Sequence, residues 1–355
     1  MQSSNSIFRI LLTIAAIVII LAGIKMATEI VIPFLLSLFI AIICSPIVKS
    51  MTDRKVPLWL AITLLFVLFA IGFTFLAGLI NSTIKEFTAS IPSYKILLSE
   101  RIALLLDFVK EWNIPVNISE DSIMNELDPS RIMNFVSRLL LSFSGVVTNI
   151  FVLLLVVVFM LFEAPTAKHR LAVALSGNKD TALKENNINR VLEGVISYLG
   201  VKTIVSLLTA ACIWIMLSLL GVQYAVLWAT LSFLLNYIPN IGSILAGVPI
   251  IVQALLLNGF SIGFGVAIGI VVINMVVGNV LEPRMMGRKL GLSTLVVFLS
   301  LLFWGWILGT VGMLLSVPLT MVLKIALESS QTTVRYALLL GDVSEDKLTY
   351  FEDKP

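Results

Sequence analysis

Polar side chains that could do chemistry are rare in this chain, and the densest group lies within residues 232–249. There Asn236 and Asn240 flank Pro239, and Gly242 follows shortly afterwards. Proline lacks an amide hydrogen and disfavours helix at the preceding residue, and glycine adds backbone freedom, so a helix is expected to break here. Irregular backbone survives in a membrane only where protein or a water-filled cavity satisfies it. The stretch is therefore the first candidate for a transport site.

Further polar side chains are scattered through the apolar runs that follow. The candidates for a transport pathway are Asn236, Tyr237, Pro239, Asn240, Gly242, Gln253, Asn274 and Asn279. Any single amide among them could instead hold two helices together, since such bonds contribute about half to one kcal/mol. The cluster at the break differs because the backbone there has unpaired groups of its own. We therefore expect this cluster to line a pathway.

Three charged residues are candidates for gating or coupling. Glu282 and Arg284 flank Pro283 and are expected to pair with each other or with nearby helix ends, because unpaired charge within a membrane costs about 3 kcal/mol. Lys202 lies inside the apolar run 195–220, where its ammonium group either extends to the membrane interface or faces a polar pathway. The first of these two readings of Lys202 is the one we expect.

The motifs of several enzyme classes are missing from the sequence. It has no Gly-rich phosphate-binding loop, no Ser/His/Asp grouping and no HExxH pattern, so we expect no enzyme activity and no cofactor. His169 is the only histidine, and Cys44 and Cys212 have no second thiol nearby, so neither a metal site nor a disulfide is indicated.

The composition is that of an integral membrane protein built from helices. Of 355 residues, 59% are hydrophobic and only 13% are charged, and several apolar runs are long enough to cross a bilayer. The net charge of +3 comes from basic residues in short loops beside these runs, which suits membrane orientation rather than nucleic-acid binding. The lipid bilayer is therefore an expected partner, and nucleic acid is not.

The sequence predicts an all-α, multi-pass bundle with about eight spans. The expected parts are three N-terminal transmembrane helices (1–80), an external amphipathic segment (81–144), transmembrane helices with a cytoplasmic loop at 164–193 (145–220), a transport core (221–328) and a cytoplasmic tail (329–355). Pro46 and Pro165 are expected to end helices. Basic loops, beginning with residues 48–57, place both termini in the cytoplasm.

The transport core is expected to contain at least one re-entrant hairpin. As one straight helix, residues 225–257 would reach about 50 Å, well beyond a hydrocarbon core of about 30 Å. Residues 294–327 form two short apolar pieces joined at Gly309, which are either two spans or a second hairpin. Residues 231–249 and 299–318 also resemble each other, as an internal repeat or by chance similarity among apolar segments.

Several runs resemble the autoinducer-2 exporter family. They are LNYIPNIGS at residues 235–243, GNVLEPRMMG at 278–287 and GLSTLVVFLS at 291–300, with FMLFE at 159–163 and GMLLSVP at 312–318. The similarity extends from the second apolar run to about residue 328. This resemblance implies a homo-oligomeric bacterial inner-membrane transporter that exports a quorum-sensing signal. Some members of the family are described as sodium or lithium/proton antiporters.

The two transport classes need different chemistry. Autoinducer-2 is small and hydroxyl-rich, and is sometimes a borate ester anion, so its site should offer amides, backbone groups and at most one cation. Exchange of a monovalent cation for a proton needs an acid that titrates within the membrane, whereas Glu29, Glu163 and Glu282 all lie near the ends of apolar runs. A scaffolding protein would leave the Pro-Gly break unexplained. We therefore expect export of autoinducer-2, with sodium or lithium/proton antiport as the alternative.

Overall fold

A computed structural model describes most of the chain outside one long segment. It covers residues 2–75, 150–176, 181–239, 241–286, 291–328 and 333–341, with Gly78, Ile96 and Glu100. Within these residues the regular structure is helical, and one isolated antiparallel bridge joins Leu292 to Gly341. The expected all-α class is confirmed. Most of the expected external segment, 81–144, lies outside the described residues.

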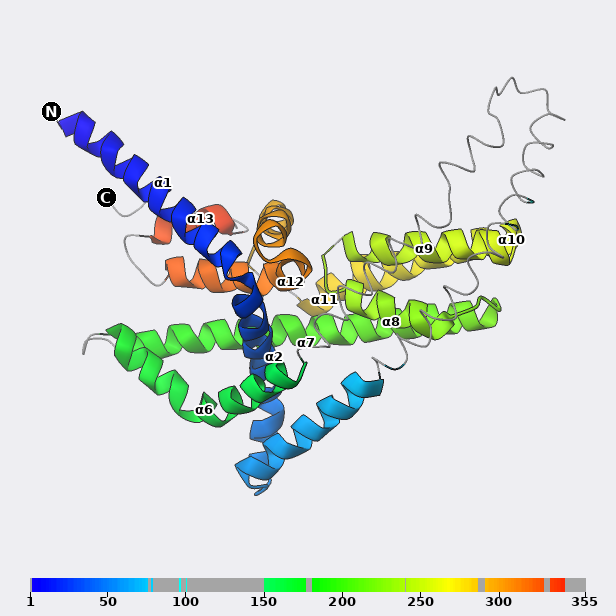
Figure 1. Ribbon diagram of the computed structural model, residues 1–355, viewed down its shortest axis with the longest axis horizontal. Helices are drawn as coiled ribbons and strands as arrows, with labels where there is room; N and C mark the ends of the chain where they lie inside the picture. The colour runs from blue at the N-terminus through cyan, green and yellow to red at the C-terminus, as the bar shows by residue number, and fades with distance from the viewer. Residues whose placement is uncertain are drawn as a thin grey trace. The chain divides into compact units, whose positions relative to one another are not determined.

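The described helices follow one another along the chain as shown in Figure 1. They are α1 (Gln2–Met26), α2 (Thr28–Asp53), a helix at Leu58–Phe75, α6 (Ile150–Ser176), α7 (Thr181–Leu219), α8 (Ala225–Leu235), α9 (Ile241–Leu257), α10 (Phe260–Ile273), the π-helix η1 (Asn274–Leu281), α11 (Glu282–Met286), α12 (Thr294–Glu328) and α13 (Val334–Leu340). Among the described residues, 6 helical segments are long and apolar enough to cross a membrane. Shorter apolar helices, including α8 and α9, accompany them.

The chain divides into two compact units, each assembled from separate stretches. The first unit contains residues 1–66, 149–200 and 286–355, and the second contains 67–148 and 201–285. Helix α7 contributes its N-terminal part to the first unit and its C-terminal part to the second. The candidate pathway residues within 201–285 therefore belong to the second unit.

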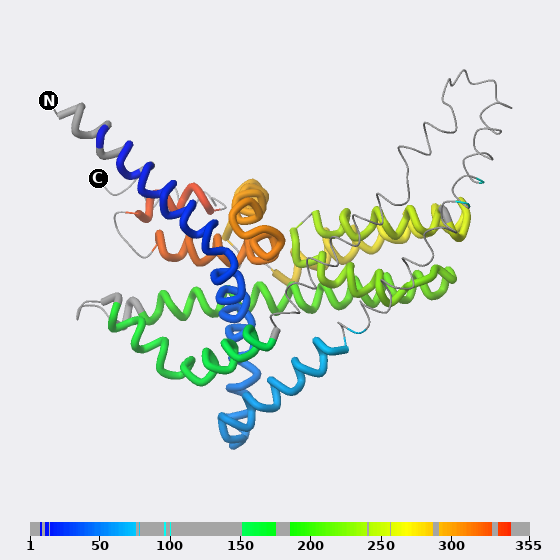
Figure 2. The backbone as a smooth tube through the Cα atoms, viewed as in Figure 1, coloured from blue at the N-terminus to red at the C-terminus, as the bar shows by residue number. Residues whose placement is uncertain are grey.

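In the first unit, α2 packs against α6, and α12 packs against α1, α2 and α13. The chain changes direction between α1 and α2 (Figure 2), and Ala27 is the residue that precedes α2. The buried Ser37 hydroxyl donates to the Leu153 carbonyl at 3.0 Å and so joins α2 to α6. A hydroxyl bonded to a backbone carbonyl stabilises a contact between apolar helices where water is absent.

Helix α2 continues through Pro46 to Asp53, although this proline was expected to end it. A proline inside a helix leaves the carbonyl four residues earlier without its amide donor. Here that carbonyl belongs to Ile42, and the Ser45 hydroxyl donates to it at 2.9 Å. The serine replaces the missing hydrogen bond, so the helix persists.

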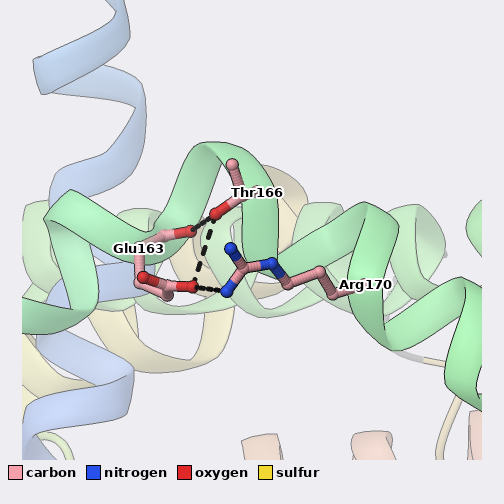
Figure 3. A network of polar contacts seen from close by, with 3 residues as sticks. All are labelled: Glu163, Thr166 and Arg170. Atoms are coloured by element: carbon pink, nitrogen blue, oxygen red, sulfur yellow. Dashed lines mark hydrogen bonds and ion pairs between the residues drawn. The ribbon is translucent and has the colours of Figure 1, made fainter.

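Helix α6 likewise passes through Pro165, and the expected loop 164–193 is helical in all of its described residues. Figure 3 shows the polar network around the proline: the Thr166 hydroxyl donates to the Glu163 carbonyl at 3.1 Å, and Arg170 forms an ion pair with Glu163. Glu163 and Arg170 are two helical turns apart on one face. The ion pair therefore joins Glu163, which precedes the proline, to Arg170, which follows it.

The second unit contains α8, α9, α10 and η1, with α9 lying beside both α8 and α10 (Figure 1). Among the described residues, the largest fully buried side chain is Trp228 of α8, and Leu227, Leu231 and Leu235 of the same helix are buried with it. The chain then runs from α10 through η1 into α11 without a loop. A π-helix of this length is rare, and π turns are often found at functional sites.

The expected break between α8 and α9 is confirmed. Helix α8 ends at Leu235 and α9 begins at Ile241, and tight turn hydrogen bonds, such as Ile238 N to the Leu235 carbonyl at 2.8 Å, hold the connection. A Cβ atom on Gly242 would lie 1.8 Å from the Leu235 carbonyl oxygen. The absence of a side chain at Gly242 therefore lets the two arms fold back on each other. Asn240 lies outside the described residues.

Helix α12 is a second hairpin, broken at Gly309, which has φ 63° and ψ −146°. The Trp304 indole donates to the Thr320 hydroxyl at 3.0 Å, whereas a straight helix would separate these residues by about 24 Å. A Cβ on Gly312 would lie 2.0 Å from the Trp304 carbonyl oxygen. The resemblance between residues 231–249 and 299–318 thus corresponds to two hairpins with the same glycine contact.

Candidate functional site

A polar stripe on α7 faces the break between α8 and α9. Lys202, Ser206 and Thr209 follow at helical spacing on one face of α7 and are all buried. The Asn236 side-chain amide, in the break, donates to the Ser206 hydroxyl at 3.0 Å. In an apolar environment such polar groups associate because an unpaired one is costly.

Tyr237 fixes the break to the same helix. Its hydroxyl lies 2.8 Å from the Thr203 hydroxyl, and its ring packs edge-on against Phe233 with centroids 5.6 Å apart. A tyrosine anchored at both ring and hydroxyl leaves little freedom at that point. The geometry of the break is therefore set jointly by α7 and α8.

A small cavity lies between α7, the α8–α9 break and the end of α10. Its lining residues are Thr209, Ile213, Ser232, Asn236, Ser243, Ala246, Gly247, Ile270 and Asn274. The cavity offers about 10 Å³ to the centre of a water-sized sphere, which is room for about one water molecule. Its polar lining consists of hydroxyl and amide groups, and none of the lining residues is charged. Such a lining can both donate and accept hydrogen bonds.

A buried ion pair lies further along the stripe on α7. The Lys202 ammonium is 2.6 Å from a Glu282 carboxylate oxygen, and the two side chains are only 4% and 19% exposed. The Lys202 ammonium is therefore enclosed by the protein and does not extend outward past it, and Glu282 pairs with Lys202 and not with Arg284, which is exposed. Both expectations were wrong for the same reason. The two residues are 80 positions apart in the sequence and meet only through the tertiary fold.

The predicted pathway residues separate into groups. Asn236 and Asn274 line the cavity, and Tyr237, Pro239 and Gly242 lie in or beside the break. The other two described residues of the set lie elsewhere. Gln253 accepts from the Trp228 indole at 2.7 Å and donates to the Gln223 carbonyl at 3.1 Å, and Asn279 is exposed on η1.

The sequence analysis missed the hydroxyl groups of the site. Ser232, Thr209 and Ser243 line the cavity, and Ser206 supports Asn236. Serine and threonine inside helices usually bond to their own backbone, so they drew no attention. The spacing of Lys202, Ser206 and Thr209 on one face of an apolar helix was the signal that could have identified the stripe.

Within the described residues, the structure brings together no group of three or more His, Cys, Asp or Glu side chains that could hold a metal ion. The chemistry that the cavity supports is the binding of a small group through neutral hydrogen-bonding partners. A lining of this kind suits a pathway for a polar solute.

The sequence pattern of the AI-2E family transporter matches residues 14–331. This chain belongs to the AI-2E transporter family. It is 67% identical to a putative transport protein of Haemophilus influenzae over 98% of this chain and 100% of that protein. It is also similar to the Escherichia coli AI-2 transport protein TqsA, at 41% identity over 95% and 97% of the two chains. The putative transport protein YhhT of the same organism is 40% identical, with 96% of each chain covered.

Membership of the AI-2E family agrees with the architecture. The chain is a membrane transporter of helical type, and the family match covers the described helices from α2 to α12 that carry the two hairpins. The match to TqsA covers almost the whole of both chains.

Proposed function

We propose that this AI-2E transporter exports autoinducer-2, a small hydroxyl-rich signal, and that the solute passes the cavity beneath the α8–α9 break. The observation that carries the proposal is the cavity lining, in which Asn236, Asn274 and hydroxyl side chains present neutral hydrogen-bonding groups and no charge. Hydroxyl groups of a solute can exchange bonds with such partners as readily as with water. The similarity to a protein named as an AI-2 transport protein supports the same substrate.

The membrane arrangement follows from the hairpins and the basic residues. We place the protein in the bacterial inner membrane with both termini cytoplasmic, because basic residues gather in the segments beside the N-terminal helices. Residues 221–328 act as the transport core, in which α8–α9 and the folded α12 enter the membrane as re-entrant hairpins. Large apolar side chains exposed on α9 and α10, such as Ile244, Phe264 and Ile268, suit contact with lipid or with other copies in a homo-oligomer.

Purified protein in proteoliposomes tests this function. Labelled autoinducer-2 should cross the membrane at a rate well above that of protein-free vesicles, with and without a pH gradient, and sodium should not be required. Labelled sodium should show no protein-dependent flux in the same vesicles. Protein-dependent sodium flux without any flux of autoinducer-2 would contradict the proposal.

Sodium or lithium/proton antiport is the second candidate, and the pair of Lys202 and Glu282 is the observation that favours it. An acid within the protein could take up a proton and release its partner. Glu282→Gln cannot titrate, so in an antiporter the cation-driven proton movement reported by a pH-sensitive dye would disappear while the protein still folds. In the export function the dye should show no cation-driven signal with either protein.

A further inference from the structure

Hydroxyl groups inside the helices of this protein usually bond to their own backbone. The Thr209, Ser300 and Ser316 hydroxyls donate to carbonyls three or four residues earlier, at 2.8 to 2.9 Å. This bond is open to any helical serine that adopts the right rotamer. It removes the need for an outside partner, and so it is the expected state of a buried hydroxyl.

Ser232 is different. Its side chain is 3% exposed, and its hydroxyl oxygen forms no hydrogen bond within the described part of the chain. A buried hydroxyl without a partner is unfavourable, so such a group in a native protein calls for an explanation. The residue lies in the last turn of α8, one turn after the fully buried Trp228, and it lines the cavity.

The cavity supplies the explanation. Asn236 lies one helical turn after Ser232, and Asn274, at the start of η1, and Ser243, on α9, line the same space. The free volume corresponds to about one water molecule, which is also the size of one hydroxyl group. A single hydroxyl placed there would meet an oxygen that has no other partner.

We propose that the Ser232 hydroxyl binds one hydroxyl group of the transported solute, and that this site selects uncharged, hydroxyl-bearing molecules over ions. For autoinducer-2 the bound species is then the borate-free form. The inference rests on the proposed function for the identity of the solute. It adds the residue that recognises the solute and the charge state that the site accepts.

The charges around the cavity decide which form is accepted. None of the lining residues is charged, so an anion would lose its hydration without gaining a cation as partner. A cation would likewise meet no carboxylate. The α7 stripe carries one charged side chain, Lys202, and its charge is already paired with that of Glu282. A neutral hydroxyl group loses less hydration free energy than an ion does when it enters such a site.

Ser300 provides a matched control. In the resemblance between the two hairpins it occupies the place of Ser232, because each serine follows a leucine in the first arm of its hairpin. It is also buried, but its hydroxyl donates to the Val297 carbonyl at 2.8 Å. A change at Ser300 therefore tests the effect of altering a buried serine without altering the cavity.

The experiment measures protection of a thiol at this position. Cys44 and Cys212 are first replaced by alanine, and Ser232→Cys or Ser300→Cys is added to this background. Labelling by methyl methanethiosulfonate is followed in purified protein with borate-free autoinducer-2, with autoinducer-2 plus excess borate, and with sodium or lithium chloride. Saturating borate-free autoinducer-2 should slow labelling at position 232 about tenfold, equivalent to about 1.4 kcal/mol. Borate should remove this protection, the salts should give none, and position 300 should be unaffected throughout.

Three outcomes would overturn the inference. In the first, a thiol at 232 never reacts, since no solute could then reach the site. In the second, the salts or the borate ester protect the thiol as well as the neutral form does. In the third, positions 232 and 300 are protected equally.

A separate measurement distinguishes failure of this inference from failure of the proposed function. If wild-type proteoliposomes move autoinducer-2 and the thiol at 232 is not protected, the export function stands and the site is wrong. If the thiol at 232 is protected but wild-type proteoliposomes move no autoinducer-2, the site stands and the export function is wrong.

The flux assay gives a second readout. Ser232→Ala should raise the half-saturating concentration of autoinducer-2 about tenfold, which is the 1.4 kcal/mol expected for about one lost hydrogen bond. Ser300→Ala should leave this concentration unchanged. Equal values for the two variants would show that Ser232 does not contact the solute.

Discussion

Asn236 uses one side chain both to hold two elements together and to line the cavity. Its amide nitrogen donates to Ser206 on α7, and the residue also lines the cavity. An amide that served only to join helices would need the bond to Ser206 and would not have to line a cavity. The position of Asn236 between α7 and the cavity is what makes it a candidate for the pathway.

Replacing Asn236 by leucine should reduce transport more than it reduces stability. The change removes a hydrogen-bonding group from the cavity and leaves Ser206 unpaired, for a stability loss of about 1 to 3 kcal/mol. Flux of labelled autoinducer-2 and thermal unfolding in detergent measure the two effects. Asn279→Leu is the matched control, because Asn279 is exposed on η1 and its loss should affect neither. Normal flux in Asn236→Leu at equal reconstitution would mean that the amide serves packing only.

The Lys202–Glu282 pair predicts a coupling between two substitutions. Lys202→Met or Glu282→Gln alone leaves one buried charge without its partner and should lower stability by about 3 to 5 kcal/mol. The double variant should recover much of this loss, because no uncompensated charge remains. Glu163→Gln serves as the control, since its pair with Arg170 is exposed and contributes little. Additive losses in the double variant, measured by thermal unfolding, would show that the two groups do not interact.

At the scale of elements, both hairpins depend on a glycine lying against a carbonyl of the opposite arm. Gly242 approaches the Leu235 oxygen and Gly312 the Trp304 oxygen, so closely that no side chain fits at either glycine. The backbone cannot yield as a flexible side chain would. The two hairpins therefore share one geometric requirement.

Gly242→Ala and Gly312→Ala should each destabilise their hairpin strongly. Relief of the clash requires the arms to separate, and we expect a loss of about 3 kcal/mol or more, comparable to severe overpacking. Gly200→Ala is the control. It lies in α7 with open space around it, so alanine there should be neutral or stabilise the helix by up to about 1 kcal/mol. Wild-type unfolding temperatures for both hairpin variants would contradict the close contact.

Local sequence signals were sufficient for the breaks but not for the continuity of helices. Pro239 with Gly242, and Gly309 alone, marked the hairpin turns because proline and glycine act on their own backbone. Pro46 and Pro165 carry the same local signal, yet α2 and α6 continue through them. In α2 the Ser45 hydroxyl bonds to the carbonyl that the proline leaves without a donor, and a rule applied to proline alone does not include such a contact.

The site was predictable only where its chemistry is carried by unusual residue types. Asn236 and Asn274 stood out as amides in apolar runs, and both line the cavity. Ser232 did not stand out, because the sequence does not reveal which rotamer a serine adopts or whether a cavity faces it. The partner of Glu282 was equally hidden, since the sequence gives no distance between α7 and α11.

At the scale of the whole molecule, the basic segments predict one orientation in the membrane. Single cysteines in place of Lys55, Lys184 and Lys289, in a background without Cys44 and Cys212, should be labelled only from the cytoplasmic side by a membrane-impermeant reagent. A cysteine in place of Lys110 should be labelled only from outside. Labelling of position 289 from outside would mean that residues 225–257 cross the membrane completely, and the re-entrant hairpin would be wrong.

The central claim is that the solute passes the cavity beneath the α8–α9 break. Ala246→Leu tests it most directly, because Ala246 is buried and lines the cavity, so a larger side chain there should fill the cavity. Overpacking of this kind should lower the free energy of unfolding by about 1 to 3 kcal/mol. Ile244→Phe is the matched control on α9, since Ile244 is 63% exposed and points away from the buried interior. In proteoliposomes with equal amounts of folded protein, flux of labelled autoinducer-2 should be nearly abolished by Ala246→Leu and preserved in Ile244→Phe. Wild-type flux through Ala246→Leu would contradict the account.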